Sequence, residues 1–282
     1  MSLIVFVQAR IQNVSSGNRK GTTSMIQWLF RLLRNRKPIS SRLDALCRPL
    51  HYQKCLSDKR YAGVPIGLGA VHFIDEADLA PADVLICRGD GSDGIWSLIL
   101  HGSSGDYVHA AIYVGDGFVV EAVQGGVRRT TLAELINRYP YVVASRCPGA
   151  SPDAMPDLAE KVVDFCLKHA NAKTLYNLGG AVMAPIRELK ELRYENRTHL
   201  PYLPRPLKGP KTSFFCSELV FEAFIHGGYI REGEMEAASR SPTALAEDSA
   251  FYHIGYLGNR EIADHIWAQD HFMTGGIPRI ER

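Results

Sequence analysis

The middle third of the chain alternates between hydrophobic and other positions with the period of a β-strand. Between 107 and 114, one face of the segment carries Val108, Ala110, Ile112 and Val114. The letters "GDG" at 115–117 predict a hairpin turn, and "FVVEAV" at 118–123 predicts the returning strand. Further strands are expected at 84–87, at 127–132 ("VRRTTL") and at 141–148. We therefore predict an antiparallel meander in this part of the chain.

Three other segments have the period of a helix. The segment "PDLAEKVVDFCLKHA" (156–170) predicts an amphipathic helix. "SFFCSELVFEAF" (213–224) predicts a more apolar helix, with Ser213 as the N-cap and the glycines at 227–228 as the end. "SMIQWLFRLLRNRK" (24–37) has apolar residues at helical spacing and basic residues at its C-terminal end, where the helix dipole favours cations. This mixture of strands and helices predicts an α+β protein.

The distribution of charge suggests three regions along the chain. Residues 1–60 contain 12 Lys and Arg against two acidic residues, a balance of +10, and the remainder carries 20 basic and 28 acidic side chains, a balance of −8. We predict a basic N-terminal extension at 1–70, a main domain at 71–260 and a C-terminal tail at 261–282. A basic arm is typical of a chain that binds an anionic surface or an acidic protein. Helix 24–37 is then either a membrane-surface helix or an accessory helix on the main domain.

Composition places the chain among folded soluble proteins. Apolar residues make up 46% of the 282 positions and charged residues 22%. No apolar run reaches the roughly 18 residues that a membrane span needs. The apolar patch Leu3–Val7 is too short for the core of a secretory signal. We therefore expect synthesis in the cytoplasm without a recognisable signal peptide.

The cysteines predict neither a zinc site nor a disulfide framework. They stand at 47, 55, 87, 147, 166 and 216, without C-x-x-C spacing and without a cluster of histidines. The loop "GDGSDG" lacks the Lys-Ser/Thr of a phosphate-binding loop. We expect no metal and no cofactor. A cysteine in such a chain is most often a buried, reduced hydrophobe, and this interpretation applies to Cys216 unless other residues change it.

Three residues together predict a catalytic thiol. Cys216 lies in the first turn of its expected helix, and a helix N-terminus and a neighbouring histidine both favour the thiolate form. His109 stands on a predicted strand, which would hold a general base rigidly. Glu121 stands in the otherwise apolar strand 118–123, where a carboxylate needs a partner, and the hairpin returns it beside the strand of His109. We predict Cys216, His109 and Glu121 as nucleophile, base and orienting carboxylate.

The motifs around these residues resemble a known superfamily. "ADVLICRGD", "YVHAAIYVG" and "EA" at 121–122, followed much later by "FFCSELVFEAF", look like the NlpC/p60 papain-like superfamily. More narrowly, the order His, Glu, Cys resembles the circularly permuted YiiX-like branch, which is related to lecithin retinol acyltransferase-type proteins. "LYNLGG" (175–180) is similar to the tyrosine segment of that branch and "SPTALAEDSAFYHIG" (241–255) to its closing strand.

The resemblance implies a permuted papain-like fold, with an antiparallel sheet packed on the helix of Cys216. It implies a thiol hydrolase that cleaves an amide bond through a thioester, with Tyr107, Tyr176 and Ser217 near the substrate or oxyanion. The expected substrates are peptidoglycan peptides, reached by an antibacterial effector that a dedicated secretion system delivers. The alternatives are a lipid-directed thiol hydrolase or acyltransferase, and a non-catalytic binding module on the same fold. No nucleic-acid partner is expected.

Overall fold

The computed structural model describes residues 71–89, 107–181, 183, 184, 187, 211–232, 237–246, 248, 250–270 and 273. All of them belong to the compact unit Leu43–Arg282. The predicted basic extension, including helix 24–37, lies outside the described residues.

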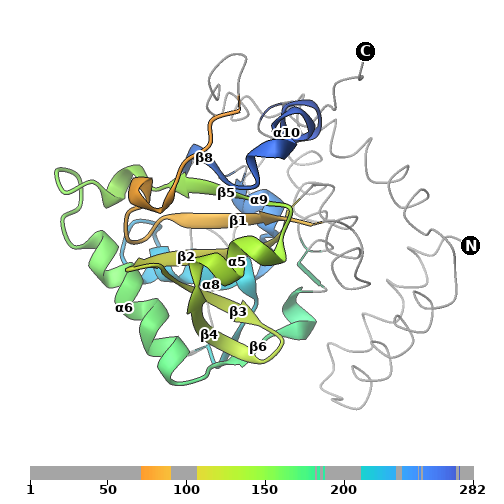
Figure 1. The fold of residues 1–282 in the computed structure, drawn as a ribbon. Coiled ribbons are helices and arrows are strands. Elements are labelled where there is room, and N and C mark those ends of the chain that lie inside the picture. The colour runs from red at the N-terminus through yellow and green to blue at the C-terminus, as the bar shows by residue number, and fades with distance from the viewer. Residues whose placement is uncertain are drawn as a thin grey trace, which may run out of the picture. The chain divides into compact units, whose positions relative to one another are not determined.

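A six-stranded sheet forms the centre of the described region (Figure 1). The strands lie in the order β4-β3-β2-β1-β5-β8, and each is antiparallel to its neighbours. They are β1 (Val84–Arg88), β2 (Tyr107–Gly115), β3 (Phe118–Val123), β4 (Gly126–Thr131), β5 (Tyr141–Arg146) and β8 (Tyr252–Gly258). The predicted meander is confirmed, since consecutive strands β2, β3 and β4 lie side by side.

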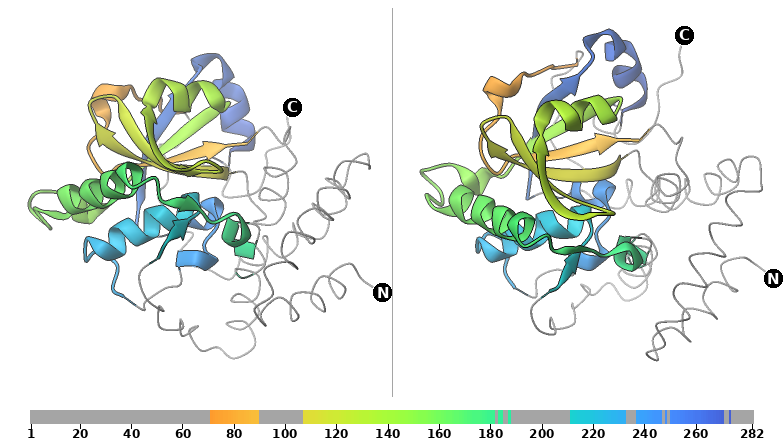
Figure 2. Two further views of the ribbon diagram at one scale, coloured as in Figure 1. Left: turned by 90° about the horizontal axis from the view of Figure 1, so that it is seen from below. Right: turned by 60° about the horizontal axis from the view of Figure 1, so that its bottom comes forward.

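Helices cover both faces of this sheet (Figure 2). One face carries α5 (Leu132–Arg138), and the other carries α6 (Leu158–Asn171), α8 (Cys216–His226) and α9 (Pro242–Ala246). The remaining elements are the helix α10 (Ala263–Gln269), the parallel pair β6 (Leu175–Tyr176) and β7 (Ser213–Phe214), and the short 3-10 helices η2 (Glu76–Asp78), η3 (Pro148–Ala150), η4 (Ala237–Ser239) and η5 (Arg260–Ile262). An α+β fold with an antiparallel sheet packed on α8 is therefore confirmed.

The alternation of β2 separates two hydrophobic cores. Ala110 and Ile112 belong to the core on the side of α8, whereas Ala111 and Tyr113 belong to the core on the side of α5. The hairpin to β3 turns through Gly115, Asp116 and Gly117, whose φ angles are all positive, as the sequence "GDG" predicts. Strand β2 therefore presents alternate side chains to two different layers of the protein.

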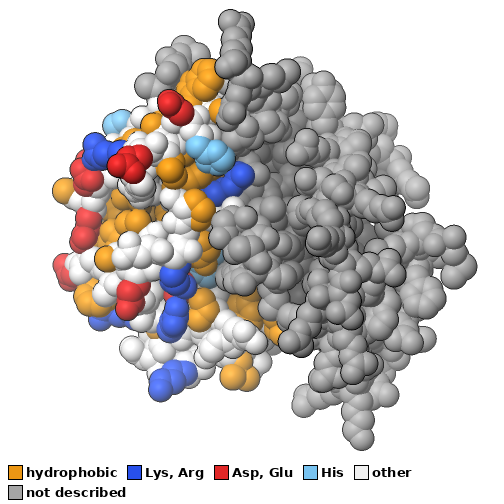
Figure 3. Space-filling model, turned by 45° about the vertical axis from the view of Figure 1, so that its right-hand side comes forward, with side chains coloured by type: hydrophobic (Ala, Val, Ile, Leu, Met, Phe, Trp, Pro, Cys, Tyr) orange, Lys and Arg blue, Asp and Glu red, His pale blue; other side chains and the backbone are white. Residues whose placement is uncertain are grey.

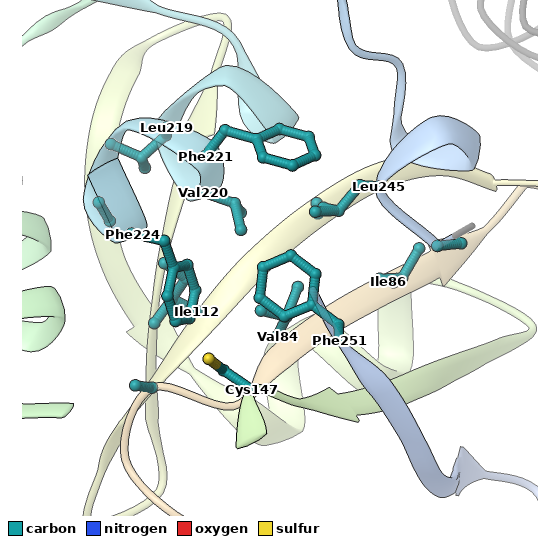
Figure 4. Close-up of a cluster of buried hydrophobic side chains, with 14 of the residues drawn as sticks. Val84, Ile86, Ile112, Cys147, Leu219, Val220, Phe221, Phe224, Leu245 and Phe251 are labelled. Atoms are coloured by element: carbon teal, nitrogen blue, oxygen red, sulfur yellow. The ribbon is translucent and has the colours of Figure 1, made fainter. Parts of the chain in front are cut away.

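The larger core lies between the sheet and α8 (Figure 4). Side chains of α8 point toward strands β1 and β2, and the residues that meet there are Val84, Ile86, Ile112, Leu219, Val220, Phe221 and Phe224. Phe221 and Phe224 are fully buried, and burying a side chain of this size stabilises the fold by about 1.5–3 kcal/mol. This packing fixes α8, and with it the residue at its N-terminus, against the sheet.

The structure corrects three sequence-based interpretations of local structure. After β4 the chain forms helix α5, which the meander prediction missed, although Thr131 and Glu134 have the spacing of a capping box. The segment similar to a closing strand, 241–255, contains helix α9 before β8 begins. Ser213 does not cap α8, because it pairs in β7 and the helix begins three residues later.

The C-terminal segment adds a buried cluster to the domain. Within the predicted tail at 261–282, α10 leads to Asp270, which is fully buried. Its carboxylate accepts hydrogen bonds of 2.7 Å from the hydroxyls of Tyr107, Tyr141 and Tyr256. Three strands, β2, β5 and β8, are therefore joined to the segment that follows α10.

Acidic, basic and hydrophobic side chains are interspersed over the described part of the face in Figure 3. Within the described residues, no helix combines the length and the apolar character that crossing a membrane requires.

Candidate active site

Cys216 is the first residue of α8, and its position depends on the strand before it. Phe215, the N-cap, is extended, with φ −99° and ψ 174°. It directly follows β7, which pairs with β6. The thiol therefore lies where the backbone N–H groups and the dipole of the helix favour negative charge. The helix ends at Gly227 and Gly228, as predicted.

A buried carboxylate stabilises the turn that carries Cys216. Glu218 is 2% exposed and accepts hydrogen bonds from the backbone N–H of Phe215 at 3.2 Å and from Asn177 Nδ2 at 3.3 Å. Lys211 Nζ lies 2.8 Å from its other oxygen. The "SE" that follows the cysteine thus supplies a helix cap whose charge is neutralised.

His109 lies between Cys216 and Glu121. Its Nε2 is 2.7 Å from Oε2 of Glu121. A hydrogen bond between the imidazole and Cys216 is also among the interactions that raise the pKa of His109. The histidine is 1% exposed, and its strand β2 is held by hydrogen bonds on both sides. The structure therefore brings the three predicted catalytic residues together.

The register of the hairpin explains the position of Glu121. Its direct partner across β2 and β3 is Ala111, which shares a face of β2 with His109 two residues earlier. Glu121 and His109 are thus diagonal neighbours, within reach of a long side chain. The alternation in the sequence predicts the shared face, and the hairpin turn predicts the proximity.

Two arginines bind the same carboxylate. Arg128, directly opposite on β4, has Nη2 at 2.9 Å from Oε1 of Glu121. Arg138, the last residue of α5, has Nη2 at 2.7 Å from Oε1 and 2.8 Å from Oε2. Glu121 is fully buried, so these contacts compensate a charge that solvent does not reach.

The pKa values of His109 and Glu121 are shifted by the groups that contact them. Burial alone would lower the pKa of His109, but its hydrogen bonds to Cys216 and Glu121 outweigh burial and raise the pKa to about 9. Burial alone would raise the pKa of Glu121, but His109 and Arg138 lower it to about 2. The contacts of the site therefore favour an imidazolium beside a carboxylate.

The other described cysteines lie in environments that disfavour a thiolate. Burial raises the pKa of Cys87, Cys147 and Cys166 above the ordinary range of a thiol. All three are free and buried, in agreement with the prediction of reduced cysteines. None of them is the first residue of an α-helix, although Cys147 precedes the short 3-10 helix η3.

The residues predicted near the substrate have different surroundings. Burial, followed by the charges of Cys216 and Glu218, raises the pKa of Tyr176, so its hydroxyl stays protonated and can donate near the thiol. The Tyr107 hydroxyl instead donates to Asp270 and is fully buried. The Ser217 hydroxyl donates to the carbonyl of Arg240 at 2.7 Å, and this residue is also fully buried.

Sequence reasoning missed the residues that surround His109 and Glu121. Tyr139 stacks on His109, with ring centroids 5.7 Å apart and planes at 14°, and Arg138 precedes it. The available signal was the capping box of Thr131 and Glu134, which indicates that a helix begins shortly before this position. Cys87 lies directly opposite His109 on β1. Among the described residues, no group of three or more His, Cys, Asp or Glu side chains is arranged to hold a metal ion.

Comparison with known proteins gives one distant similarity. No family model matches the chain. The chain is similar to the probable lipoprotein peptidase YaeF of Escherichia coli (strain K12), with 25% identity in a 202-residue alignment that covers 64% of this chain and 70% of that protein. This weak similarity points toward the same superfamily as the motifs around Cys216 and His109.

Proposed function

We propose that the protein is a cysteine peptidase or amidase with Cys216 as its nucleophile. The observation that carries the proposal is the buried His109, hydrogen-bonded to Cys216 on one side and to Glu121 on the other. This is the arrangement that activates a thiol for acyl transfer. The similarity to a probable lipoprotein peptidase supports a peptidase-like activity at the level of reaction class.

The proposed reaction has two stages. The Cys216 thiol passes its proton to His109, the thiolate attacks the carbonyl carbon of an amide, and the His109 imidazolium gives that proton to the departing amine as the C–N bond breaks, leaving a thioester. Water then attacks the thioester carbonyl while His109 takes a proton from it, which releases a carboxylic acid and restores the Cys216 thiolate beside the His109 imidazolium. Glu121 stabilises the imidazolium throughout, and the backbone N–H of Cys216 and the Tyr176 hydroxyl are the proposed donors to the oxyanion.

We further propose peptide amide bonds of peptidoglycan as the substrate. The resemblance of the "HAAIYVG" and "FFCSEL" segments to the NlpC/p60 superfamily supports this class. An antibacterial effector delivered by a secretion system remains our proposal for how the enzyme reaches such a substrate. The basic extension at 1–70 is then proposed to bind an anionic surface or a protein partner.

The test is muropeptide mass spectrometry of purified sacculi incubated with the wild-type protein and with Cys216→Ala. New fragments from the wild type alone are expected, and their masses identify the bond that is cut. Equal fragments from both proteins would reject Cys216 as the nucleophile. If neither protein releases fragments, the peptidoglycan substrate is rejected, and vesicles of acyl-ester lipids become the next substrates, with the same variant as the control.

A further inference from the structure

Two consecutive residues at the end of α5 contact two different members of the site. Arg138 Nη2 lies 2.7 and 2.8 Å from the two oxygens of Glu121. Tyr139 stacks on the imidazole of His109 in a nearly parallel orientation, at 5.7 Å between ring centroids. The two residues that they contact, Glu121 and His109, are the members of the site that lie behind the thiol of Cys216.

The helix fixes both side chains. Thr131 and Glu134 form a capping box at the start of α5, and the buried Leu132 and Leu135 pack it on the sheet. At the other end, Arg138 Nε donates to the carbonyl of Glu134 at 3.2 Å, which folds the guanidinium back along the helix. A side chain held at both its Nε and Nη2 atoms has few alternative rotamers, so it can impose an orientation on its partner.

Arg138 and Arg128 hold the carboxylate of Glu121 in different ways. Arg128 contacts only Oε1, through Nε at 3.0 Å and Nη2 at 2.9 Å. Arg138 contacts both oxygens, including Oε2, the oxygen that faces His109. The Arg128 side chain is also the more exposed, 51% against 34%. Arg138 is therefore the arginine that fixes the plane of the carboxylate with respect to His109.

Without Arg138, the remaining contacts do not determine that plane. The carboxylate could keep Arg128 on Oε1 and rotate Oε2 away from His109. A carboxylate that no longer faces the imidazole ceases to select its tautomer and to stabilise its charge. On the other side, loss of the Tyr139 ring would open the His109–Glu121 contact to water, and water weakens an ion pair.

We propose that Arg138 and Tyr139 are positioning residues, which hold Glu121 and His109 in the orientation that activates Cys216. The inference rests on the proposed function, because it explains how the same thiol is activated. It concerns reactivity rather than substrate, and its test therefore needs no substrate.

The experiment measures alkylation of Cys216 by iodoacetamide in the full chain, from about pH 5 to about pH 10, by mass spectrometry of the peptide that contains this residue. The variants are Arg138→Ala, Arg138→Lys and the control Arg129→Ala. Arg129 belongs to the same strand as Arg128 but stacks on Phe118 at 3.7 Å instead of binding Glu121. Thermal unfolding of each variant is followed by circular dichroism, so that loss of the fold is recognised.

We expect Arg138→Ala to slow alkylation near neutral pH about tenfold, and to move the rise of the alkylation rate with pH to higher pH, because a less stabilised imidazolium stabilises the thiolate less. Guanidinium chloride at a concentration below its denaturing range should restore the rate of this variant and leave the wild type unchanged. Arg138→Lys should recover only part of the rate, since a lysine lacks the Nε group that the carbonyl of Glu134 holds in place. Arg129→Ala should match the wild type.

The ring of Tyr139 is tested in the same assay. Tyr139→Phe keeps the stack and should react as the wild type does, whereas Tyr139→Leu removes the stack and should react more slowly. Equal profiles for the wild type, Arg138→Ala and Tyr139→Leu would overturn the inference. So would a slower Arg138→Ala variant that guanidinium does not restore.

The outcomes separate this inference from the proposed function. If wild-type Cys216 reacts no faster than a free thiol at the same pH, the activated nucleophile itself is rejected, and the inference with it. If wild-type Cys216 is reactive but indifferent to Arg138, only the inference is rejected. If the variants behave as expected and sacculi stay intact, the peptidoglycan substrate is rejected while the positioning residues stand.

Discussion

Glu121→Gln is expected to make the stability of the protein much less dependent on pH between about pH 6 and about pH 9.5. The substitution keeps the size of the side chain, but it replaces one acceptor oxygen by an amide donor and removes the negative charge beside His109. The His109 and Glu121 side chains are 1% and 0% exposed and are 2.7 Å apart. Solvent therefore screens their interaction little.

The magnitude follows from the pKa of His109, which burial would lower but which the contacts with Cys216 and Glu121 raise from 6.5 to about 9. That difference corresponds to about 3 kcal/mol of stabilisation. Since the folded pKa is the higher one, the stabilisation is complete below about pH 6.5 and is lost as the pH rises through about 9. Cys216 shares in the effect, so we expect at least about 1 kcal/mol of it to depend on Glu121.

Glu121 sets the acidic side of the same window. Its pKa is lowered from 4.5 to about 2, so its contribution is complete above about pH 4.5 and is lost as the pH falls through about 2. The two values describe one ion pair and are not added. The pair therefore stabilises the fold fully between about pH 4.5 and about pH 6.5.

The assay is urea unfolding of the wild type and Glu121→Gln at a series of pH values, under reducing conditions, followed by circular dichroism. When the unfolding free energies of the two proteins are subtracted, the contributions of groups that titrate alike in both proteins cancel. This difference should shrink by at least about 1 kcal/mol from about pH 6 to about pH 9.5. The part that remains at high pH reflects the weakened contacts with the two arginines and does not depend on pH. A difference that stays flat or widens with pH would refute the reasoning.

Two further predictions concern the fold around the site. Asp270→Ala leaves three buried tyrosine hydroxyls without this acceptor and should lower the unfolding free energy in urea by at least about 3 kcal/mol, whereas Asp270→Asn, which keeps an acceptor, should lower it less. Equal losses would contradict this account. Gly126→Ala should lower it by about 1–3 kcal/mol, because φ is +108° and a Cβ would lie 2.8 Å from the carbonyl oxygen of Thr174. Gly125→Ala, whose Cβ meets nothing within 4 Å, should be nearly neutral, and a comparable loss there would argue against a local steric cause.

The sequence predicted the parts of the site that depend on local rules. The turn at 115–117 and the alternation of β2 are sufficient to place Glu121 beside the strand of His109. The apolar run after Cys216 predicts helix α8, of which Cys216 is the first residue. Each of these depends on residues close in sequence, where hydrophobic period and turn chemistry determine the structure.

Contacts between distant segments were not predictable in this way. The partner of the Tyr107 hydroxyl stands 163 positions later, and nothing near Tyr107 distinguishes a hydroxyl that binds Asp270 from one that faces a substrate. The β-bulge between Cys87 and Arg88 likewise shifts the register of β1 and β2 without a sequence signal. Helix α5 was missed for a different reason, because "VRRTTL" continues the strand pattern up to its N-cap.

The cluster around Asp270 has a consequence for when the site can form during synthesis. The strand that carries His109 begins with Tyr107. The hydroxyl of Tyr107 donates to the carboxylate of Asp270, which is synthesised 163 residues later. A nascent chain can therefore build the hairpin early, but it cannot complete the anchoring of this strand until residue 270 has been made. We expect the thiol of Cys216 to gain its full reactivity late in translation, so that an incomplete chain would pose little chemical hazard to the cell that makes it.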